Sequence, residues 1–228
     1  MQVNYFSGKK GLLTLAPNSI STMALKTFVK LNSISNLTEA RYGAGMYVNL
    51  LGFNLNDPSG KIIDPELFKE ITGWVSGVEF VGEFTFNSKP NLLEILKDYP
   101  AITWIEYDQI EELKSLVGKG YSLIFKADLG GILHLEPEVA QILSKQGIIL
   151  HLTSKNDQLS QDQLAAVKKL ATNCKVILGS GINSNNVMDL VETCEIFGIS
   201  LSGGEETKPG LKDLDQLADI LEILETEE

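Results

Sequence analysis

Two stretches near the C-terminal end of the chain contain the residue types that bind phosphate groups. Gly179-Ser180-Gly181 follows an apolar run at 176–178, and Ser202-Gly203-Gly204 follows a second run at 197–201. Small residues let the backbone approach a ligand closely and leave amide donors free. Either loop alone is most often an ordinary turn, but two such loops about twenty residues apart predict a phosphate cradle at the end of a β/α chain. The candidate phosphate-binding residues are Gly179, Ser180, Gly181, Ser202, Gly203 and Gly204.

Titratable residues close to the ends of other apolar runs are candidates for proton transfer. His151 lies near the end of the run 148–152, and an imidazole titrates near neutral pH. The competing interpretation is a structural histidine that is hydrogen-bonded at a barrel rim. Asp128 and Glu106 are candidate acids or bases, or simply solvated or paired charges. Lys126 is either a substrate-facing cation or Schiff-base amine, or the partner of Asp128 or Glu106 in an ion pair. We expect His134 to lie exposed in a loop.

The elements that would position these side chains alternate between short apolar runs and amphipathic helical patterns. Apolar runs occur at 28–31, 47–53, 77–84, 102–107, 121–126, 148–152, 176–178 and 197–201. Helical patterns occur at 37–44, 65–75, 90–99, 110–117, 136–145, 161–171, 185–192 and 211–224. Alternation of this kind predicts a parallel sheet, and eight units predict closure into a (β/α)8 TIM barrel. The competing open doubly wound sheet is disfavoured because the first turn lacks a Gly-x-Gly-x-x-Gly pattern.

Length and composition predict a single barrel domain over residues 23–228, with residues 1–22 as an extension outside the barrel. The net charge of −11 disfavours a nucleic acid or an anionic membrane as the partner. Cys174 and Cys194 have no metal spacing around them, so we expect buried thiols in a reducing, cytoplasmic compartment. We expect no metal and no cofactor, a small phosphorylated metabolite as the ligand, and either a monomer or a homodimer.

The chain resembles the phosphoribosylanthranilate isomerase family, a group of barrel enzymes of tryptophan biosynthesis. The resemblance is carried by Glu39-Ala40-Arg41, Gly52-Phe53, Ser59-Gly60-Lys61, Leu178-Gly179-Ser180-Gly181-Ile182-Asn183, Gly198-Ile199-Ser200-Leu201-Ser202-Gly203-Gly204 and Pro209-Gly210-Leu211-Lys212-Asp213. It implies an Amadori rearrangement as the reaction and a phosphorylated sugar derivative as the substrate. It also implies that Lys61 stands where the family has an arginine that contacts the anthranilate carboxylate, with the charge kept but the bidentate fork lost.

The departures from the family concentrate at its proton-transfer positions. Asn32 stands where the family has the cysteine that acts as the general base, and an amide cannot act as a base near neutral pH. His151 stands near the position of the aspartate that acts as the general acid, with a register uncertain by about two residues. Each such group contributes roughly 10²–10⁴-fold to the rate. Loss of both predicts that the isomerase activity is impaired or lost while the phosphate cradle is kept.

Three hypotheses follow, and the sequence leaves open whether the chain is an enzyme. The first is an isomerase-like barrel that binds a phosphorylated sugar or similar anion. The second is an active isomerase in which His151, Asp128 or Glu106 replaces the missing groups. The third is another phosphosugar isomerase, epimerase or aldolase of the same kind of barrel. Metal-dependent epimerases need two histidines and two aspartates at strand ends, and the chain contains only two histidines.

Overall fold

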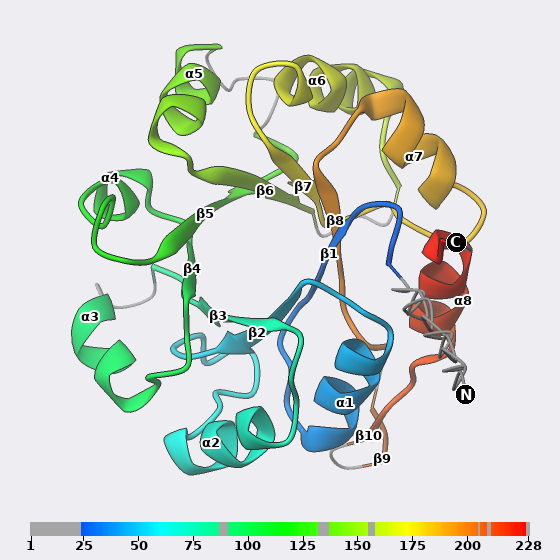
Figure 1. The fold of residues 1–228 in the computed structure, drawn as a ribbon. Helices are drawn as coiled ribbons and strands as arrows, with labels where there is room; N and C mark the ends of the chain where they lie inside the picture. The colour runs from blue at the N-terminus through cyan, green and yellow to red at the C-terminus, as the bar shows by residue number, and fades with distance from the viewer. Residues whose placement is uncertain are drawn as a thin grey trace, which may run out of the picture.

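Eight parallel strands form a closed barrel, in sequence order, in the computed structural model of the chain (Figure 1). The structure describes residues 24–86, 91–131, 137–154, 158–204, 206–208 and 211–226. The strands are β1 (Phe28–Leu31), β2 (Leu50–Asn54), β3 (Glu79–Glu83), β4 (Trp104–Tyr107), β5 (Ser122–Asp128), β6 (Ile149–Thr153), β7 (Val176–Leu178) and β8 (Gly198–Leu201). Pairing of Lys30 with Ser200 places β1 beside β8 and closes the ring. The predicted (β/α)8 TIM barrel is confirmed.

A ring of helices surrounds the barrel, one after each strand. The helices are α1 (Leu37–Gly45), α2 (Pro65–Gly73), α3 (Leu92–Ile95) with the 3-10 turn η1 (Leu96–Asp98), α4 (Ile110–Lys114), α5 (Pro137–Gln146), α6 (Gln161–Ala171), α7 (Val187–Cys194) and α8 (Asp215–Leu224). Side-chain caps fix several starts: Asn36 Oδ1 accepts from Glu39 N, and Ser160 forms a capping box with Gln163.

Two apolar clusters stabilise the barrel. The larger cluster lies between the outer faces of the strands and the helices, and it includes both cysteines, which are buried free thiols as expected. The smaller cluster fills the barrel interior toward the N-terminal ends of the strands. It comprises Leu50, Val81, Ile124, Ile149 and Ile177, with Phe28, Trp104 and Phe197 packed against them. This second cluster is an apolar floor, so a ligand can enter only from the C-terminal ends of the strands.

The observed boundaries differ from the predicted ones in three informative places. Residues 211–224 are not one helix: Leu211–Lys212 forms β10, which pairs antiparallel with β9 (Glu206–Lys208), and α8 begins only at Asp215. The helix predicted at 185–192 begins two residues later, as α7. Strand β5 continues to Asp128 because Asp128 pairs with Thr153 of β6, so Lys126 lies within the strand and not at its end.

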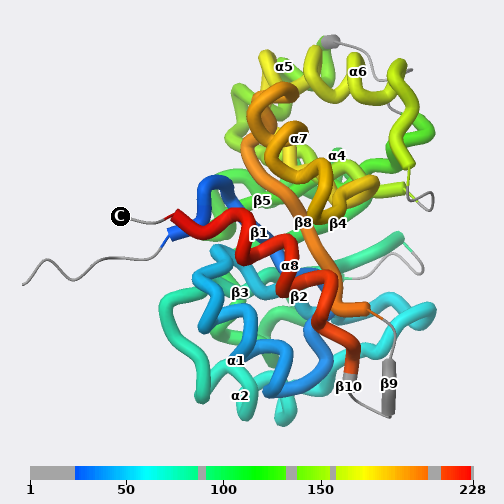
Figure 2. Tube along the Cα trace, turned by 90° about the vertical axis from the view of Figure 1, so that its right-hand side faces the viewer, coloured from blue at the N-terminus to red at the C-terminus, as the bar shows by residue number. Residues whose placement is uncertain are grey.

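The two ends of the described chain meet beside the barrel. Lys26 N donates to Leu224 O at 2.8 Å, and Thr226 N donates to Ala24 O at 2.9 Å. Helix α8 lies between α7 and α1, as seen from the side in Figure 2. The proposed extension, residues 1–22, lies outside the described residues, and so does His134.

Candidate functional site at the C-terminal ends of the strands

A buried layer of charged side chains lies directly above the apolar floor of the barrel. Lys30, Glu106 and His151 each lie two residues beyond a floor residue of the same strand, so their side chains point inward. They are 0%, 1% and 1% exposed. Charges buried to this degree are tolerated in a protein only when they are paired and hydrogen-bonded.

The Lys30 ammonium is the centre of this layer. Its Nζ atom donates to Glu83 Oε1 and Asn32 Oδ1 and lies 3.1 Å from Glu106 Oε2. Burial acts to lower the pKa of Lys30, but the carboxylates of Glu106 and Glu83 outweigh it and raise the pKa above its ordinary value. Lys30 is therefore held as a cation and is unsuited to act as an amine nucleophile.

Glu106 joins Lys30 to His151. Burial alone would favour its protonated acid, but the charges of Lys30 and His151 outweigh burial and hold the pKa of the carboxyl well below its usual range. Glu106 Oε2 lies 2.8 Å from His151 Nδ1, and because a carboxylate only accepts, Nδ1 carries the proton. A buried carboxylate thus orients the imidazole ring.

The other imidazole nitrogen of His151, Nε2, is buried and has no hydrogen-bond partner in the part of the chain that the structure describes. It packs against the backbone of Gly179, where an added Cβ would overlap with the ring. Glycine is required here for the histidine to fit. His151 therefore lies inside the barrel and not at its rim, with its free nitrogen beneath the first loop of the predicted phosphate cradle.

Asn32, the residue after β1, is fully engaged by its neighbours. Its backbone N–H donates to Leu201 O at 2.8 Å. Its side-chain oxygen accepts from Lys30, and its Nδ2 donates to Ser200 Oγ at 2.5 Å and Ser202 Oγ at 3.3 Å. Asn32 thus ties β1 to the end of β8. It has no titratable atom, and both ends of its side-chain amide are hydrogen-bonded.

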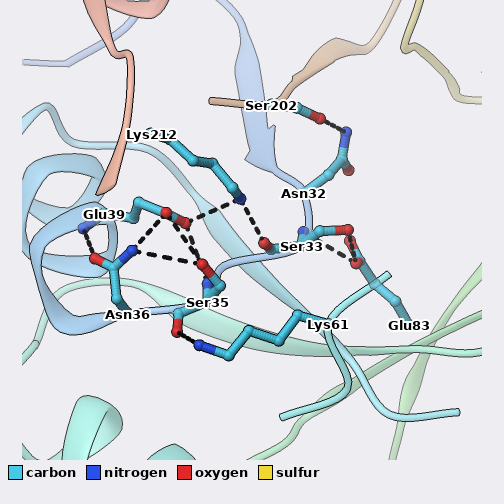
Figure 3. Close-up of polar contacts among 9 residues, drawn as sticks. All are labelled: Asn32, Ser33, Ser35, Asn36, Glu39, Lys61, Glu83, Ser202 and Lys212. Carbon is cyan, nitrogen blue, oxygen red and sulfur yellow. Dashed lines mark hydrogen bonds and ion pairs between the residues drawn. The ribbon is translucent and has the colours of Figure 1, made fainter. Parts of the chain in front are cut away.

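The loop from β1 to α1 is held by charged residues on both sides (Figure 3). Ser33 has a φ of 52°, a left-handed conformation, and both its N–H and its hydroxyl donate to Glu83 Oε2 at 3.0 and 3.1 Å. Its carbonyl accepts from Lys212 Nζ at 3.0 Å. Lys212 also lies 3.2 Å from the buried Glu39, which accepts further bonds from Ser35 and Asn36. The loop is therefore fixed before any ligand binds.

Lys61 lies on the loop between β2 and α2, at the same end of the barrel. Its Nζ atom donates to Ser35 O at 3.1 Å. Figure 3 shows its side chain directed toward Ser35 rather than toward Asn32. The ammonium thus reaches the β1–α1 loop and is only partly available for a ligand.

The two glycine loops leave neighbouring parallel strands, β7 and β8, at the same end of the barrel. Gly181 has a φ of 74°, and the Asn186 side chain holds its carbonyl at 2.7 Å. The Ser180 hydroxyl bonds the backbone of Ser154 in both directions, at 2.7 and 3.1 Å. Among the described residues, the amides of Gly181 and Gly203 have no acceptor, whereas the amide of Gly204 donates to Asp213 O at 2.7 Å.

Of the remaining candidate site residues, Asp128 and Glu106 form hydrogen bonds or ion pairs, and Lys126 does not within the described ranges. Asp128 Oδ1 accepts from Gly130 N at 2.7 Å, which makes it a turn-forming carboxylate. Glu106 is buried and paired, not solvated. Lys126 is half-buried, and within the described ranges it forms an ion pair with neither Asp128 nor Glu106, although its charge contributes to the lowered pKa of Glu106.

Sequence reasoning missed Lys30, Glu83, Glu39 and Lys212 as parts of this site. Lys30 and Glu83 lie in largely apolar strands, and a charged residue in such a strand is a signal of an inward-facing polar layer. The bonds of Glu39 and Lys212 have no such signal, because they join segments 173 residues apart.

The chain is similar in sequence to known isomerases. A family model for N-(5'-phosphoribosyl)anthranilate (PRA) isomerase matches residues 157–223. An N-(5'-phosphoribosyl)anthranilate isomerase of Chlorobium phaeobacteroides is 25% identical over 200 residues, which cover 81% of this chain and 91% of the relative. The tryptophan biosynthesis protein TrpCF of Helicobacter pylori is 22% identical over 223 residues, covering 94% of this chain but 48% of that protein. The chain thus spans about half the length of that relative.

Solved structures show the same fold. The crystal structure of phosphoribosyl anthranilate isomerase from Thermus thermophilus superposes with a TM-score of 0.70 at 24% identity, covering 86% of this chain and 98% of that one. The chain is therefore similar to phosphoribosylanthranilate isomerases over much of its sequence and in its fold.

The two positions at which the sequence is expected to depart from the family it resembles are connected in the structure. Asn32 contacts Lys30, Lys30 contacts Glu106, and Glu106 contacts His151. Asn32 and His151 both face the barrel interior, Asn32 from the end of β1 and His151 from β6. Asn32 and His151, which the resemblance places at or near the positions of the family's base and acid, are therefore the two ends of one chain of hydrogen bonds and ion pairs.

Two negative observations concern the described residues only. No group of three or more histidine, cysteine, aspartate or glutamate side chains there is arranged to hold a metal ion. None of the helices in the same residues is long and apolar enough to cross a membrane.

Proposed function

We propose that this chain is a phosphoribosylanthranilate-isomerase-like barrel that binds a phosphorylated sugar-type ligand, with the family's Amadori reaction impaired or lost. The observation that carries this proposal is Asn32. The residue at the end of β1 has no titratable atom, and its amide is satisfied by Lys30, Ser200 and Ser202. The reaction needs a base and an acid placed against the sugar, and binding energy alone cannot replace them.

The kept phosphate loops support the binding half of the proposal. The free amides of Gly181 and Gly203 belong to loops from adjacent strands, and amides are good ligands for a phosphate dianion. We propose that the phosphate lies against the loops Gly179-Ser180-Gly181 and Ser202-Gly203-Gly204. The amides of Gly181 and Gly203 are the proposed donors, since those of Gly179 and Gly204 already donate to Leu152 O and Asp213 O. Lys61 is a further candidate contact, since a ligand anion can replace its single bond to Ser35. A related barrel has been crystallised with reduced 1-(o-carboxyphenylamino)-1-deoxyribulose 5-phosphate.

Calorimetry with ribose 5-phosphate tests phosphate binding. Gly181→Asp introduces a negative charge and a side chain that would collide with Leu159, so it should abolish binding. Gly147→Asp is the matched control, because Gly147 has a similar φ of 68° but open space around it and lies before β6, at the other end of the barrel. Equal binding by both variants would refute the cradle.

Complementation of a tryptophan auxotroph that lacks the isomerase tests the loss of activity. We expect no growth from the wild-type chain, and none from Asn32→Cys, because the acid position would still hold a histidine. Robust growth with the wild-type chain would overturn the claim of impaired chemistry.

An active isomerase is the second candidate, favoured by the Glu106–His151 pair. A carboxylate that holds Nδ1–H and leaves Nε2 unbonded is the usual way to orient a histidine base. Against this, Nε2 is closed off by Gly179 in this structure. If the wild-type chain complements, His151→Ala should abolish growth. Growth that survives His151→Ala would exclude this histidine as the replacement group.

A further inference from the structure

The Nε2 atom of His151 is a buried nitrogen with no hydrogen-bond partner in the part of the chain that the structure describes. The side chain is 1% exposed, and Glu106 Oε2 holds the other ring nitrogen, Nδ1, at 2.8 Å. The ring cannot turn to find a partner for Nε2 without giving up that contact. Buried polar atoms without a partner are rare in folded proteins, and on this ring Nε2 is the atom that can bind another proton.

Gly179 brings Nε2 into contact with the first glycine loop. A Cβ atom at this position would lie only 2.5 Å from Nε2, so the ring packs against the backbone of the loop itself. The loop is held there because Gly179 N donates to Leu152 O at 2.8 Å. Two residues later, Gly181 offers one of the proposed phosphate donors. A charge on Nε2 and an anion on the loop would therefore interact largely through the protein, where charges are screened less than in water.

The charged groups around His151 come from strands β1, β3, β4 and β5. Glu106 of β4 contacts Nδ1, and Lys126 of β5 is the cross-strand neighbour of His151. Lys30 of β1 contacts Glu106 and also pairs with Glu83 of β3. Strand β7, on the other side of His151, contributes no titratable side chain. These two lysines and two glutamates balance, so a second proton on the imidazole gives this layer a net positive charge.

That charge decides how proton binding and anion binding affect each other. An anion on the glycine loops and a positive charge on the imidazole attract, so each strengthens the binding of the other by the same factor. Protonation also directs an N–H group at the backbone of Gly179, which is unfavourable. This cost is present with and without the anion while the loop keeps its position, so it cancels from the difference. The coupling is therefore positive.

We propose that a tetrahedral dianion binds to the two glycine loops together with a proton on His151 Nε2, so that the site binds its ligand more tightly as the pH falls. This inference rests on the proposed phosphate-binding function and adds a proton to it. The proton comes from solvent and stays on the imidazole, and no covalent bond of the ligand changes. Histidine side chains change their charge between about pH 5 and about pH 8, so the effect belongs to that range.

Calorimetry with sulfate at about pH 5.5 and about pH 8 tests the coupling, because sulfate stays a dianion over this range whereas a phosphate monoester gains a proton near about pH 6. We expect the wild-type chain to bind sulfate about tenfold more tightly at the lower pH. His151→Gln keeps an amide donor for Glu106 but cannot take up a second proton, so its affinity should differ little between the two pH values. His134→Gln, the same change at the other histidine of the chain, should keep the wild-type dependence.

A second measurement needs no substitution at His151. Sulfate binding at about pH 6.5, measured in two buffers with different heats of ionisation, gives the number of protons taken up with the anion. We expect the wild-type chain to take up a fraction of one proton per sulfate. Sulfate should also move the NMR titration of the His151 Cε1–H signal to higher pH. The His134→Gln chain has a single histidine, which identifies this signal.

Different failures lead to different conclusions. Sulfate affinities that are equal at the two pH values, with no proton uptake, would overturn the coupling while leaving the phosphate cradle intact. A pH dependence that persists in His151→Gln would place the linked proton on another group and would also overturn it. If neither sulfate nor ribose 5-phosphate binds at any pH, the proposed function is refuted, and this inference with it.

Discussion

At the scale of single residues, Glu106 is the member of the buried layer that links Lys30 to His151. One carboxylate oxygen contacts both Lys30 and His151, and the side chain is 2% exposed. Buried ion pairs are not strong sources of stability in themselves, because desolvation offsets attraction. Removing one partner is nevertheless costly, since the remaining charge stays buried.

Glu106→Gln should therefore lower the free energy of unfolding by about 3–5 kcal/mol, because Lys30 would lose one of its two carboxylates. Urea denaturation monitored by circular dichroism measures the loss. Glu111→Gln is the matched control: Glu111 pairs with Lys114 but is 75% exposed, so its loss should cost no more than about 1 kcal/mol. Similar losses in the two variants would show that the buried layer is not strained by an unpaired charge.

The acid sensitivity of the fold should also depend on Glu106. Its pKa is held below the ordinary value in the folded chain, so it contributes stability above its unfolded pKa of about 4.3 and loses it as the pH falls further. The free energy of unfolding of the wild-type chain should decline more steeply than that of Glu106→Gln as the pH is lowered from about 5 to about 3. If the free energies of unfolding of the two proteins fall equally with pH, other carboxylates cause the acid sensitivity.

At the scale of elements, Lys212 joins the β9–β10 hairpin to the β1–α1 loop. Its bonds to Ser33 O and Glu39 connect the segment after β8 with the segment after β1. The loop next to Asn32 is thus fixed by a residue from the other end of the chain. Strands β1 and β8 pair to close the barrel. The bonds of Lys212 join the loops that follow the same two strands.

Lys212→Met should lower the free energy of unfolding by about 1–3 kcal/mol, because Glu39 keeps its bonds to Ser35 and Asn36 but loses its cation. Amide hydrogen exchange at residues 33–36 should become faster, since the Ser33 carbonyl is released. Lys97→Met provides the comparison, as Lys97 is 68% exposed and its ion pair is with the exposed Glu94. Unchanged exchange at 33–36 would mean that Glu83 and Glu39 alone fix the loop.

At the scale of the whole molecule, the described chain begins and ends in one place. The backbone bonds of Lys26 with Leu224, and of Thr226 with Ala24, attach residues 24–26 to the end of α8. The ring of helices is closed by α8 between α7 and α1 (Figure 2). These contacts indicate that residues 24–26 contribute to the stability of the barrel.

A chain that starts at Met23 should unfold in one transition with the same midpoint as the full chain, if residues 1–22 are an extension outside the barrel. A chain that starts at Thr27 should be less stable by about 1–3 kcal/mol, because both backbone bonds to the end of α8 are lost. Thermal unfolding of the three chains measures this. A large loss on removing residues 1–22 alone would show that they belong to the domain.

The sequence by itself determined the architecture of this protein. Parallel strands that are buried on both faces appear in the sequence as apolar runs, such as 176–178. When such runs alternate with amphipathic helical patterns, only a few folds can form all the backbone hydrogen bonds and bury the apolar surface. The glycines of the proposed phosphate loops, Gly179 and Gly181, are equally visible in the sequence, because a turn or a close approach of the backbone needs glycine at its own positions. Asn32 could be recognised as unsuited to base chemistry because an amide lacks a titratable proton in any environment.

Only the tertiary structure decided how the charged residues are used. Whether Glu106 is solvated or paired, and whether His151 lies at the rim or inside, depends on strands that are far apart in sequence and meet only when the barrel closes. The same holds for Lys126, whose cross-strand neighbour in the barrel is His151, 25 residues further along the chain. Electrostatic interactions act through space, so a sequence displays the charges but not their partners.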